Sequence, residues 1–158
     1  MPLPAGGPFT MKISCGDYMI CLQDVLLGEV YIAAGQSNME FPLQDELHGE
    51  DAIQSAQAEQ IRYYEVPQVV YEDSTQRLPD LPEGSWSLCT PERAAGFSAI
   101  AHYFAQGLFE ELQVPVGIIS CNKGGTSASC WLSTESLRQE PVLRRTYLDP
   151  YEKAVADL

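Results

Sequence analysis

The stretch Glu29–Glu40, EVYIAAGQSNME, joins an apolar run to a polar turn that carries a serine. The β-branched and aromatic residues of 29–33 predict a buried strand, and Gly35 permits a tight exit from it. Open α/β sheets carry their chemistry at the carboxyl ends of the strands, so Ser37 lies where a nucleophile would act. A helix beginning just beyond would aim unpaired backbone amides at the same place. Ser37 is the candidate nucleophile, although Gly-x-Ser after a strand also occurs in plain polar turns.

The rest of the chain predicts alternating strands and helices. Strands are expected at 9–15 and 18–22, as a hairpin, and at 29–34, 61–66 and 114–121. Helices are expected at 51–60, at 97–112 with Ser98 or Gly96 near its start, near Ser127, and in the tail 134–158, where Pro141 and Pro150 break it. Residues 67–95 are rich in proline and predict a long surface loop. This order favours right-handed crossovers and a parallel sheet in a three-layer α/β/α fold.

Length and charge narrow the class of protein. A chain of 158 residues normally forms one domain with a substantial core. The 22 acidic and 9 basic residues give a net charge of −13, which repels polyphosphate backbones, so nucleic acid is not an expected partner. The sequence has neither the apolar run of a membrane span nor, in Met1–Pro8, the pattern of a signal peptide, so we expect no membrane association. Either the protein is intracellular or its true start lies elsewhere.

The five cysteines predict neither a zinc site nor a disulfide framework. They include no C-x-x-C pair, and an odd number cannot all be bridged within one chain. A hairpin turning at 16–17 would pair Cys15 with Tyr18 and Cys21 with Lys12, which sets the two sulfurs about 10 Å apart. Reduced cysteines and a reducing, cytoplasmic compartment are the simpler expectation, and the apolar neighbours of Cys121 and Cys130 predict that both are buried. No metal is expected.

Three motifs together resemble a known family. They are Gly35–Pro42 (GQSNMEFP), Phe97–Ala101 (FSAIA), and Val116–Ile119 (VGII) followed by Gly124-Gly125-Thr126 and Trp131. In order and spacing, from about residue 7 to 137, the chain resembles the sialate O-acetylesterases, serine esterases of the SGNH hydrolase superfamily. The resemblance implies a flavodoxin-like three-layer sandwich that removes acetyl groups from O-acetylated sugars without a cofactor.

The resemblance also implies roles for individual residues. Ser37 would form an acyl-enzyme, and the oxyanion would be held by backbone amides of Ser37, Gly124 and Gly125, with Gly96 as a weaker candidate. The superfamily often has an asparagine donor after the third strand, but Asn122 lies slightly early for it. Candidate substrate contacts are Gln36, Asn38, Trp86 and Thr126. Trp86 equally fits a packing role, which is the favoured interpretation for Trp131.

The same resemblance divides the chain and leaves part of the catalytic machinery outside it. Residues 1–27 resemble the remnant of a preceding β-domain, and 28–158 a partial SGNH hydrolase domain. The implied catalytic Asp-x-x-His lies well beyond residue 158. Asp45 and His48 have its literal spacing but follow Ser37 on the exit loop, and His102 is expected to pack in a helix. The chain alone is therefore expected to be weakly active or inactive.

Three alternatives stay open at this point. Family members can be secreted or lysosomal, so the compartment is not fixed by the cysteines. An open sheet edge would allow self-association. A non-catalytic glycan-binding or assembly module would share the same motifs, whereas a phosphate-binding loop at Lys123–Thr126 lacks the Walker spacing.

Overall fold

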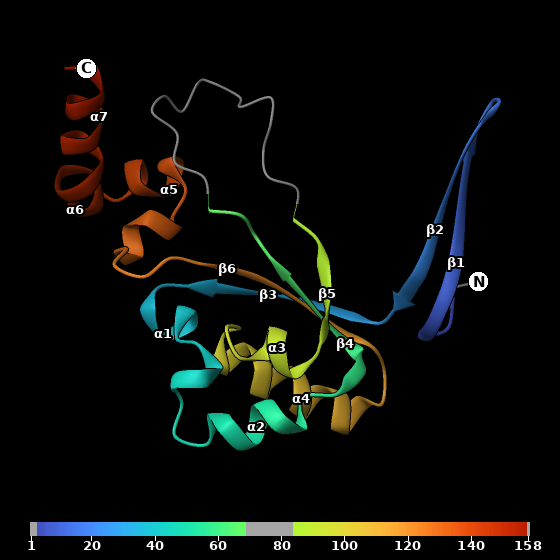
Figure 1. Cartoon of the computed structure of the whole chain (residues 1–158). Coiled ribbons are helices and arrows are strands. Elements are labelled where there is room, and N and C mark those ends of the chain that lie inside the picture. Colours follow the sequence, from blue (N-terminus) through green and yellow to red (C-terminus); the bar gives the residue numbers. More distant parts are fainter. Residues whose placement is uncertain (1–2, 69–83, 158) are drawn as a thin grey trace.

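The computed structural model describes residues 3–68 and 84–157 (Figure 1). The strands are β1 (Gly6–Cys15), β2 (Tyr18–Leu27), β3 (Glu29–Gly35), β4 (Ala58–Glu65), β5 (Trp86–Cys89) and β6 (Val116–Asn122). The α-helices are α1 (Ser37–Glu40), α2 (Gly49–Ser55), α3 (Pro91–Ala94), α4 (Ala99–Leu112), α5 (Thr134–Gln139), α6 (Pro141–Leu143) and α7 (Asp149–Ala156). Short 3-10 helices span Leu43–Asp45 and Ala128–Trp131, and a π-helical turn spans Arg144–Leu148.

A four-stranded sheet forms the centre of a mixed α/β fold. Its strand order is β3-β6-β4-β5, with β3 and β4 parallel to β6 and with β5 antiparallel at the edge. Strand β6, the last of the three parallel strands in sequence, lies between β3 and β4. The parallel register brings their carboxyl ends to one edge, where Gly35 lies opposite Asn122 and Glu65 opposite Ser120.

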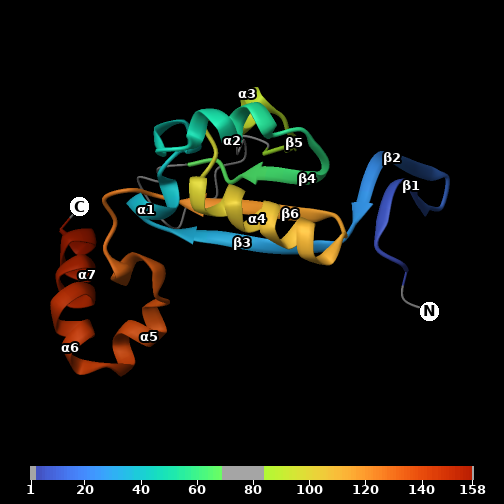
Figure 2. The same cartoon turned by 90° about the horizontal axis from the view of Figure 1, so that it is seen from below.

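Helices cover one face of this sheet in the described residues (Figure 2). Alternate strand residues point to that face, and Ile61, Tyr63 and Ile118 are almost fully buried there against Phe97 and α4. The intervening residues of β3 point the other way, where Val30 is 57% and Ile32 70% exposed. The period of two along β3 thus separates a covered face from an open one. The prediction of a buried strand at 29–33 is therefore wrong for the described residues, because nothing there covers the second face of β3.

Helix α4 ends where the sequence predicts and begins at Ala99 instead of at residue 97. The side chain of Ser98 accepts a hydrogen bond from the Ala101 amide at 3.3 Å, which makes Ser98 the N-cap. Gln113 adopts a left-handed conformation with φ of 53° at the carboxyl end, and its side chain donates to the Phe109 and Glu110 carbonyls. The helix packs on the sheet through small residues, since Ala101 and Ala105 are buried.

Two expected segments differ from the structure. The helix predicted at 51–60 is α2, which ends at Ser55, because residues 58–60 extend β4 instead. The predicted surface loop at 67–95 contains β5 and α3, while residues 69–83 lie outside the described part of the chain. Strand β5 forms because it pairs with β4, from Tyr64 opposite Trp86, and that tertiary pairing has no local signal in a short proline-flanked segment.

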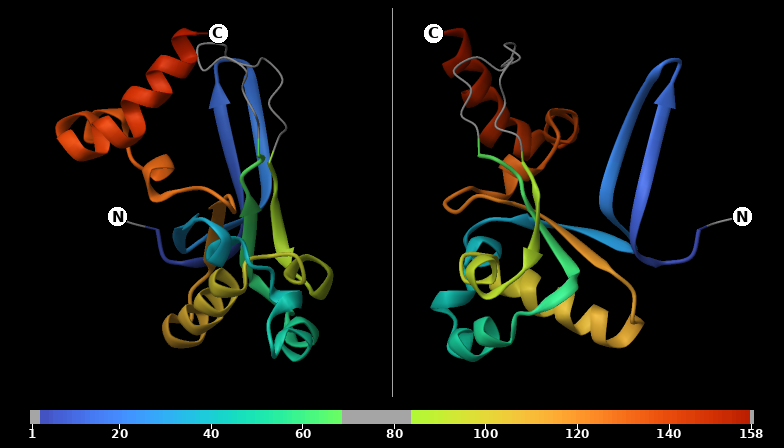
Figure 3. Two further views of the ribbon diagram at one scale, coloured as in Figure 1. Left: turned by 90° about the vertical axis from the view of Figure 1, so that its left-hand side faces the viewer. Right: turned by 45° about the vertical axis from the view of Figure 1, so that its right-hand side comes forward.

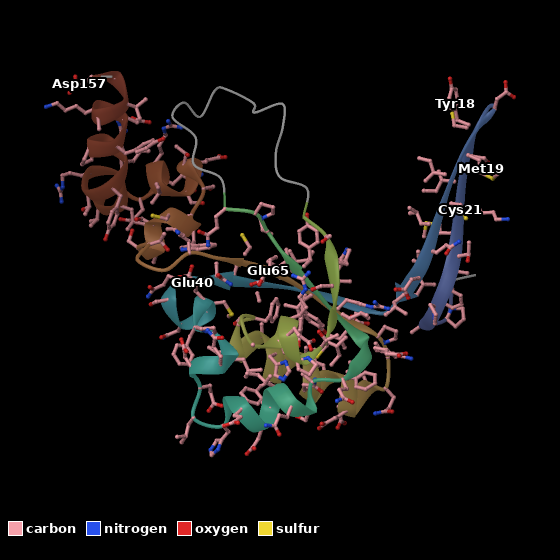
Figure 4. The ribbon with its side chains drawn as sticks, viewed as in Figure 1. Tyr18, Met19, Cys21, Glu40, Glu65 and Asp157 are labelled. Atoms are coloured by element: carbon pink, nitrogen blue, oxygen red, sulfur yellow. The ribbon has the colours of Figure 1, made fainter. Side chains whose placement is uncertain are left out.

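The hairpin β1–β2 extends away from the four-stranded sheet (Figure 3). Its register pairs Cys15 with Tyr18 and Cys21 with Lys12, which confirms the predicted turn and the separation of the two cysteines. Tyr18 is 84% and Met19 67% exposed near the turn (Figure 4).

The tail is helical, as predicted. Pro141 and Pro150 each lie in the first turn of a helix, where the missing amide hydrogen costs nothing, so they start α6 and α7 rather than break a helix. The helices α5–α7 form a group beyond the carboxyl edge of the sheet (Figures 1 and 2). Among the described helices, none combines the length and the apolar composition needed to cross a membrane.

Candidate active site

Ser37 lies at the carboxyl end of β3, exposed to solvent, as the first residue of α1. Gly35 ends the strand with φ of 157°, and a Cβ there would lie 3.2 Å from the Met39 Cβ, so a larger residue would crowd the turn. Gln36 is the N-cap. The strand-to-helix turn therefore lifts Ser37 out of the sheet, which is the geometry that a nucleophile requires.

The diglycine turn after β6 lies directly beside this serine. The Lys123 amide donates to the Gly35 carbonyl at 3.0 Å, which joins the two turns where β3 and β6 end. A Cβ built on Gly124 would be 3.8 Å from the Ser37 Cα. Gly125 has φ of 78°, a left-handed conformation that favours glycine. The structure thus brings together Ser37, Gly124 and Gly125, three of the residues predicted for the site.

Two of the four amides predicted to bind an oxyanion, those of Ser37 and Gly124, donate to side-chain oxygens. Gln36 Oε1 accepts hydrogen bonds from both the Ser37 amide, at 2.9 Å, and the Ser37 hydroxyl, at 2.6 Å. Glu40 Oε2 accepts from the Gly124 amide at 2.7 Å. Both amides therefore point at positions that an oxygen occupies, and one of these oxygens belongs to a carboxylate.

A cavity of about 500 Å³ adjoins the two turns at the carboxyl edge of β4 and β6. Its lining is polar and includes Glu40, Glu65, Arg93, Gly96, Ser98, Ser120 and Asn122. Figure 4 labels Glu40, at the end of α1, and Glu65, at the end of β4, both of which line the cavity. The side-chain amide of Asn122 donates to the Ser120 hydroxyl at 2.6 Å, and both residues line the cavity. Gly96, a predicted oxyanion donor, lies in this lining, whereas Ser37 does not line the cavity.

The predicted substrate contacts are not gathered in this cavity. Gln36 and Asn38 are exposed beside Ser37, and Thr126 donates its hydroxyl to the Lys123 carbonyl at 2.7 Å while accepting from Trp131 Nε1 at 3.0 Å. Thr126 and Trp131 therefore brace the diglycine turn.

Trp86 lies on the open face of the sheet. Its ring sits 3.1 Å from where a Cβ on Gly117 would be, with the Tyr64 ring centroid at 5.5 Å. The ring therefore fills the space above a glycine, which is a packing role, and it is 49% exposed.

Neither histidine contacts Ser37 among the described residues. His102 is 2% exposed in the core, with its Nδ1 2.6 Å from the Tyr63 hydroxyl, and burial lowers its pKa. This is the packed histidine that the sequence predicts. His48 is exposed at the start of α2, where its amide donates to Glu46 Oε2 at 2.8 Å.

The cysteines are all free, and one prediction for them is wrong. Cys130 is exposed and Cys121 is half-buried, although apolar neighbours predicted burial for both. Cys130 lies on a short 3-10 helix that does not pack on the sheet, so its neighbours in sequence do not enclose it. The described residues contain no group of three or more histidine, cysteine or acidic side chains able to hold a metal ion.

Comparisons with known proteins match this chain to acetylesterases. No family model matches it. Over 149 aligned residues, covering 87% of the chain, it is 30% identical to the sialate O-acetylesterase of Homo sapiens and 29% identical to that of Mus musculus. These similarities support assigning the chain to the sialate O-acetylesterase family. The matches cover 28% and 27% of those two proteins, so the chain spans little more than a quarter of their length.

A solved structure agrees with this family. The chain is similar to XAC1771, a carbohydrate acetylesterase from Xanthomonas citri, with a TM-score of 0.74 and 34% identity. The match covers 84% of this chain and 30% of XAC1771.

Sequence reasoning missed two side chains of the site, Gln36 as the partner of Ser37 and Glu40 as the partner of Gly124. The signal for Glu40 was its spacing, because residues three apart lie on the same side of a helix and Glu40 follows Ser37 by three.

Proposed function

We propose that the protein is a carboxylic-ester hydrolase that removes acetyl groups from sugar hydroxyls, with Ser37 as the nucleophile. The observation that carries the proposal is the position of Ser37, exposed at the end of β3 and adjacent to the diglycine turn. The names of the relatives, sialate O-acetylesterase and carbohydrate acetylesterase, support the same reaction.

The reaction would run in two steps. Ser37 Oγ adds to the acetyl carbonyl carbon and gives its proton to a base, and the tetrahedral intermediate then expels the sugar oxygen, which takes a proton. Water cleaves the acyl-enzyme and releases acetate. Backbone amides of Ser37, Gly124 and Gly125, with Gly96 as a weaker candidate, would hold the oxyanion, each worth about 3 kcal/mol in the transition state. The hydrogen bond from the Ser37 hydroxyl to Gln36 Oε1 must break before attack, because the hydroxyl has to donate its hydrogen to the base instead.

The base would come from outside this chain. The His102 ring is buried and engaged with Tyr63, and the His48 ring makes no hydrogen bond to Ser37 in the described part of the chain, where the contact with Glu46 is made by the His48 backbone amide. Without a base, only residual catalysis from binding and the oxyanion donors is expected, so the isolated chain would be weakly active at most.

The same proposal extends to the domains. Residues 28–158 would form part of a three-layer SGNH hydrolase domain, and residues 1–27 would belong to a preceding β-domain. The exposure of Val30 and Ile32 supports this, because a second helical layer on the open face would bury them.

The substrate would be an O-acetylated sugar. The polar cavity lined by Glu40, Glu65 and Asn122 adjoins the serine turn. Its carboxylates can accept hydrogen bonds from sugar hydroxyls, and the Asn122 amide can both donate and accept them.

Covalent labelling of the full-length protein tests the nucleophile. We expect a fluorophosphonate to label the native protein and p-nitrophenyl acetate to be hydrolysed, and both to be lost in Ser37→Ala. Ser55→Ala, at the exposed end of α2, is the matched control and should behave as wild type. Equal labelling of Ser37→Ala and the native protein would exclude Ser37 as the nucleophile. Binding of acetylated glycans without turnover, unaffected by Ser37→Ala, would instead indicate the non-catalytic module.

A further inference from the structure

The carboxylate of Glu40 links the serine helix to the diglycine turn. Glu40 is the last residue of α1, so it moves with Ser37, and its Oε2 accepts the Gly124 amide hydrogen at 2.7 Å. Its Oε1 accepts a second hydrogen bond from Gln68 Nε2 at 3.3 Å, and Gln68 Oε1 accepts from Lys123 Nζ at 2.6 Å. Both ends of this network therefore return to the 123–124 segment.

The fit between Glu40 and Gly124 is close. A Cβ on Gly124 would lie within van der Waals overlap of Glu40 Oε2, so only glycine leaves room for the carboxylate at this position. A hydrogen bond from an amide to a carboxylate is shorter and stronger than one between neutral groups. Glu40 is also half-buried, which limits competition from water for the Gly124 amide.

We propose that Glu40 is a positioning residue for the ester hydrolysis proposed above: it fixes the diglycine turn against Ser37 and uses the Gly124 amide as the anchor. This inference rests on that proposed function. Its consequence is a reassignment within the turn. Because the Gly124 amide is committed to Glu40, the donor that the turn offers to the oxyanion is the Gly125 amide, which has no hydrogen-bond partner among the residues that the structure describes.

A variant that keeps the contact separates geometry from charge. In Glu40→Gln the amide oxygen can still accept from Gly124, so the turn should hold its place. In Glu40→Ala the anchor is lost and the turn becomes free to move relative to Ser37. Glu111→Ala is the matched control, because Glu111 is exposed on α4 and its side chain makes no hydrogen bond or ion pair in the described part of the chain.

The contact itself can be measured without any enzymatic activity. Amide hydrogen exchange at Gly124, followed by NMR, should be slow in the native protein, in Glu40→Gln and in Glu111→Ala, and at least about tenfold faster in Glu40→Ala. Fast exchange at Gly124 in the native protein would overturn the anchor. If Ser37 is not labelled by fluorophosphonate, the proposed function fails, and the exchange data still show whether the contact exists.

Kinetics on p-nitrophenyl acetate test the positioning role, since this ester carries no sugar for Glu40 to bind. Misplacement of catalytic groups by about 1 Å costs roughly 100-fold in rate, so kcat should fall about 10- to 100-fold in Glu40→Ala at nearly unchanged KM. Glu40→Gln should recover most of this loss. A Glu40→Ala variant with native kcat overturns the inference, and so does a defect confined to the KM for acetylated sugars, which would make Glu40 a substrate contact. Gly124→Ala displaces the same carboxylate from the other side and serves if Glu40→Ala does not fold.

Discussion

The hydroxyl of Tyr63 is hydrogen-bonded to two other buried side chains, and removing this hydroxyl tests how much the buried polar group stabilises the core. Tyr63 is 1% exposed, and its hydroxyl lies 2.6 Å from His102 Nδ1 and 3.1 Å from Cys89 Sγ. The arrangement that satisfies all three groups has the thiol donating to the hydroxyl and the hydroxyl donating to a neutral imidazole. Tyr63→Phe removes only the oxygen, because the ring remains stacked on Phe97 at a centroid distance of 3.9 Å.

The cost follows from what is left unpaired. A buried acceptor without its donor costs about 1–3 kcal/mol, and here the imidazole nitrogen of His102 is that acceptor. The thiol of Cys89 adds little, since sulfur bonds weakly. We therefore expect Tyr63→Phe to lower the free energy of unfolding by about 2 kcal/mol. For a chain of 158 residues this corresponds to a fall of about 4–8 °C in Tm.

Urea denaturation of a double-mutant cycle supplies the assay. His102→Leu removes the orphaned acceptor, so Tyr63→Phe should cost much less in the His102→Leu background than in the native one, with a coupling of about 1 kcal/mol or more. A Tyr63→Phe variant within about 0.3 kcal/mol of the native protein, or strictly additive costs in the cycle, would refute this account of the core.

Four further outcomes are expected. Burial lowers the pKa of His102 below its usual 6.5, so on acidification the unfolded state takes up the proton first. The free energy of unfolding should therefore fall as pH drops from about 7 through 6.5. Denaturation of His102→Leu should lack that part of the pH dependence. Gly28→Ala should destabilise strongly in thermal melts, because a Cβ there overlaps the Pro115 carbonyl; a native Tm would contradict this. Gly117→Ala should shift the Trp86 fluorescence by displacing the indole ring, and an unchanged spectrum would show that the ring has room. A thiol reagent should modify exposed Cys15, Cys21 and Cys130 in the native state but reach buried Cys89 only on unfolding.

The sequence predicted the elements whose local signals agree with their tertiary surroundings. The apolar run before Gly35 became β3, and Ser98, one of the two residues expected near the start of α4, is its N-cap. The hairpin register near the turn could be predicted because a tight turn at 16–17 fixes the pairs from Cys15–Tyr18 to Met11–Leu22, whereas the register shifts farther from the turn, between Met11 and Gly6. In each of these segments the determining residues lie within a few positions of one another.

Prediction was wrong where the decisive partner is distant in sequence. Strand β5 exists because it pairs with β4, and the alanine- and glutamine-containing start of β4 looked helical in isolation. Strand order has the same origin: the pattern predicts three parallel strands but does not say which lies in the middle, since that depends on how α4 and the sheet pack together.

The site follows the same rule, with one consequence for its chemistry. Ser37 and the diglycine turn could be predicted because each terminates a strand, and parallel strands terminate at one edge. The partners of their amides could not, because Glu40 reaches across to a turn that is 84 residues away along the chain. Because a carboxylate oxygen accepts the hydrogen bond of the Gly124 amide, this turn favours negatively charged oxygen beside Ser37. If the Gly124 amide always donates to Glu40, the turn contributes one fewer amide to the oxyanion than the motif suggests. Glu40→Ala should then free the Gly124 amide, but kcat should still fall, because the turn is no longer held against Ser37.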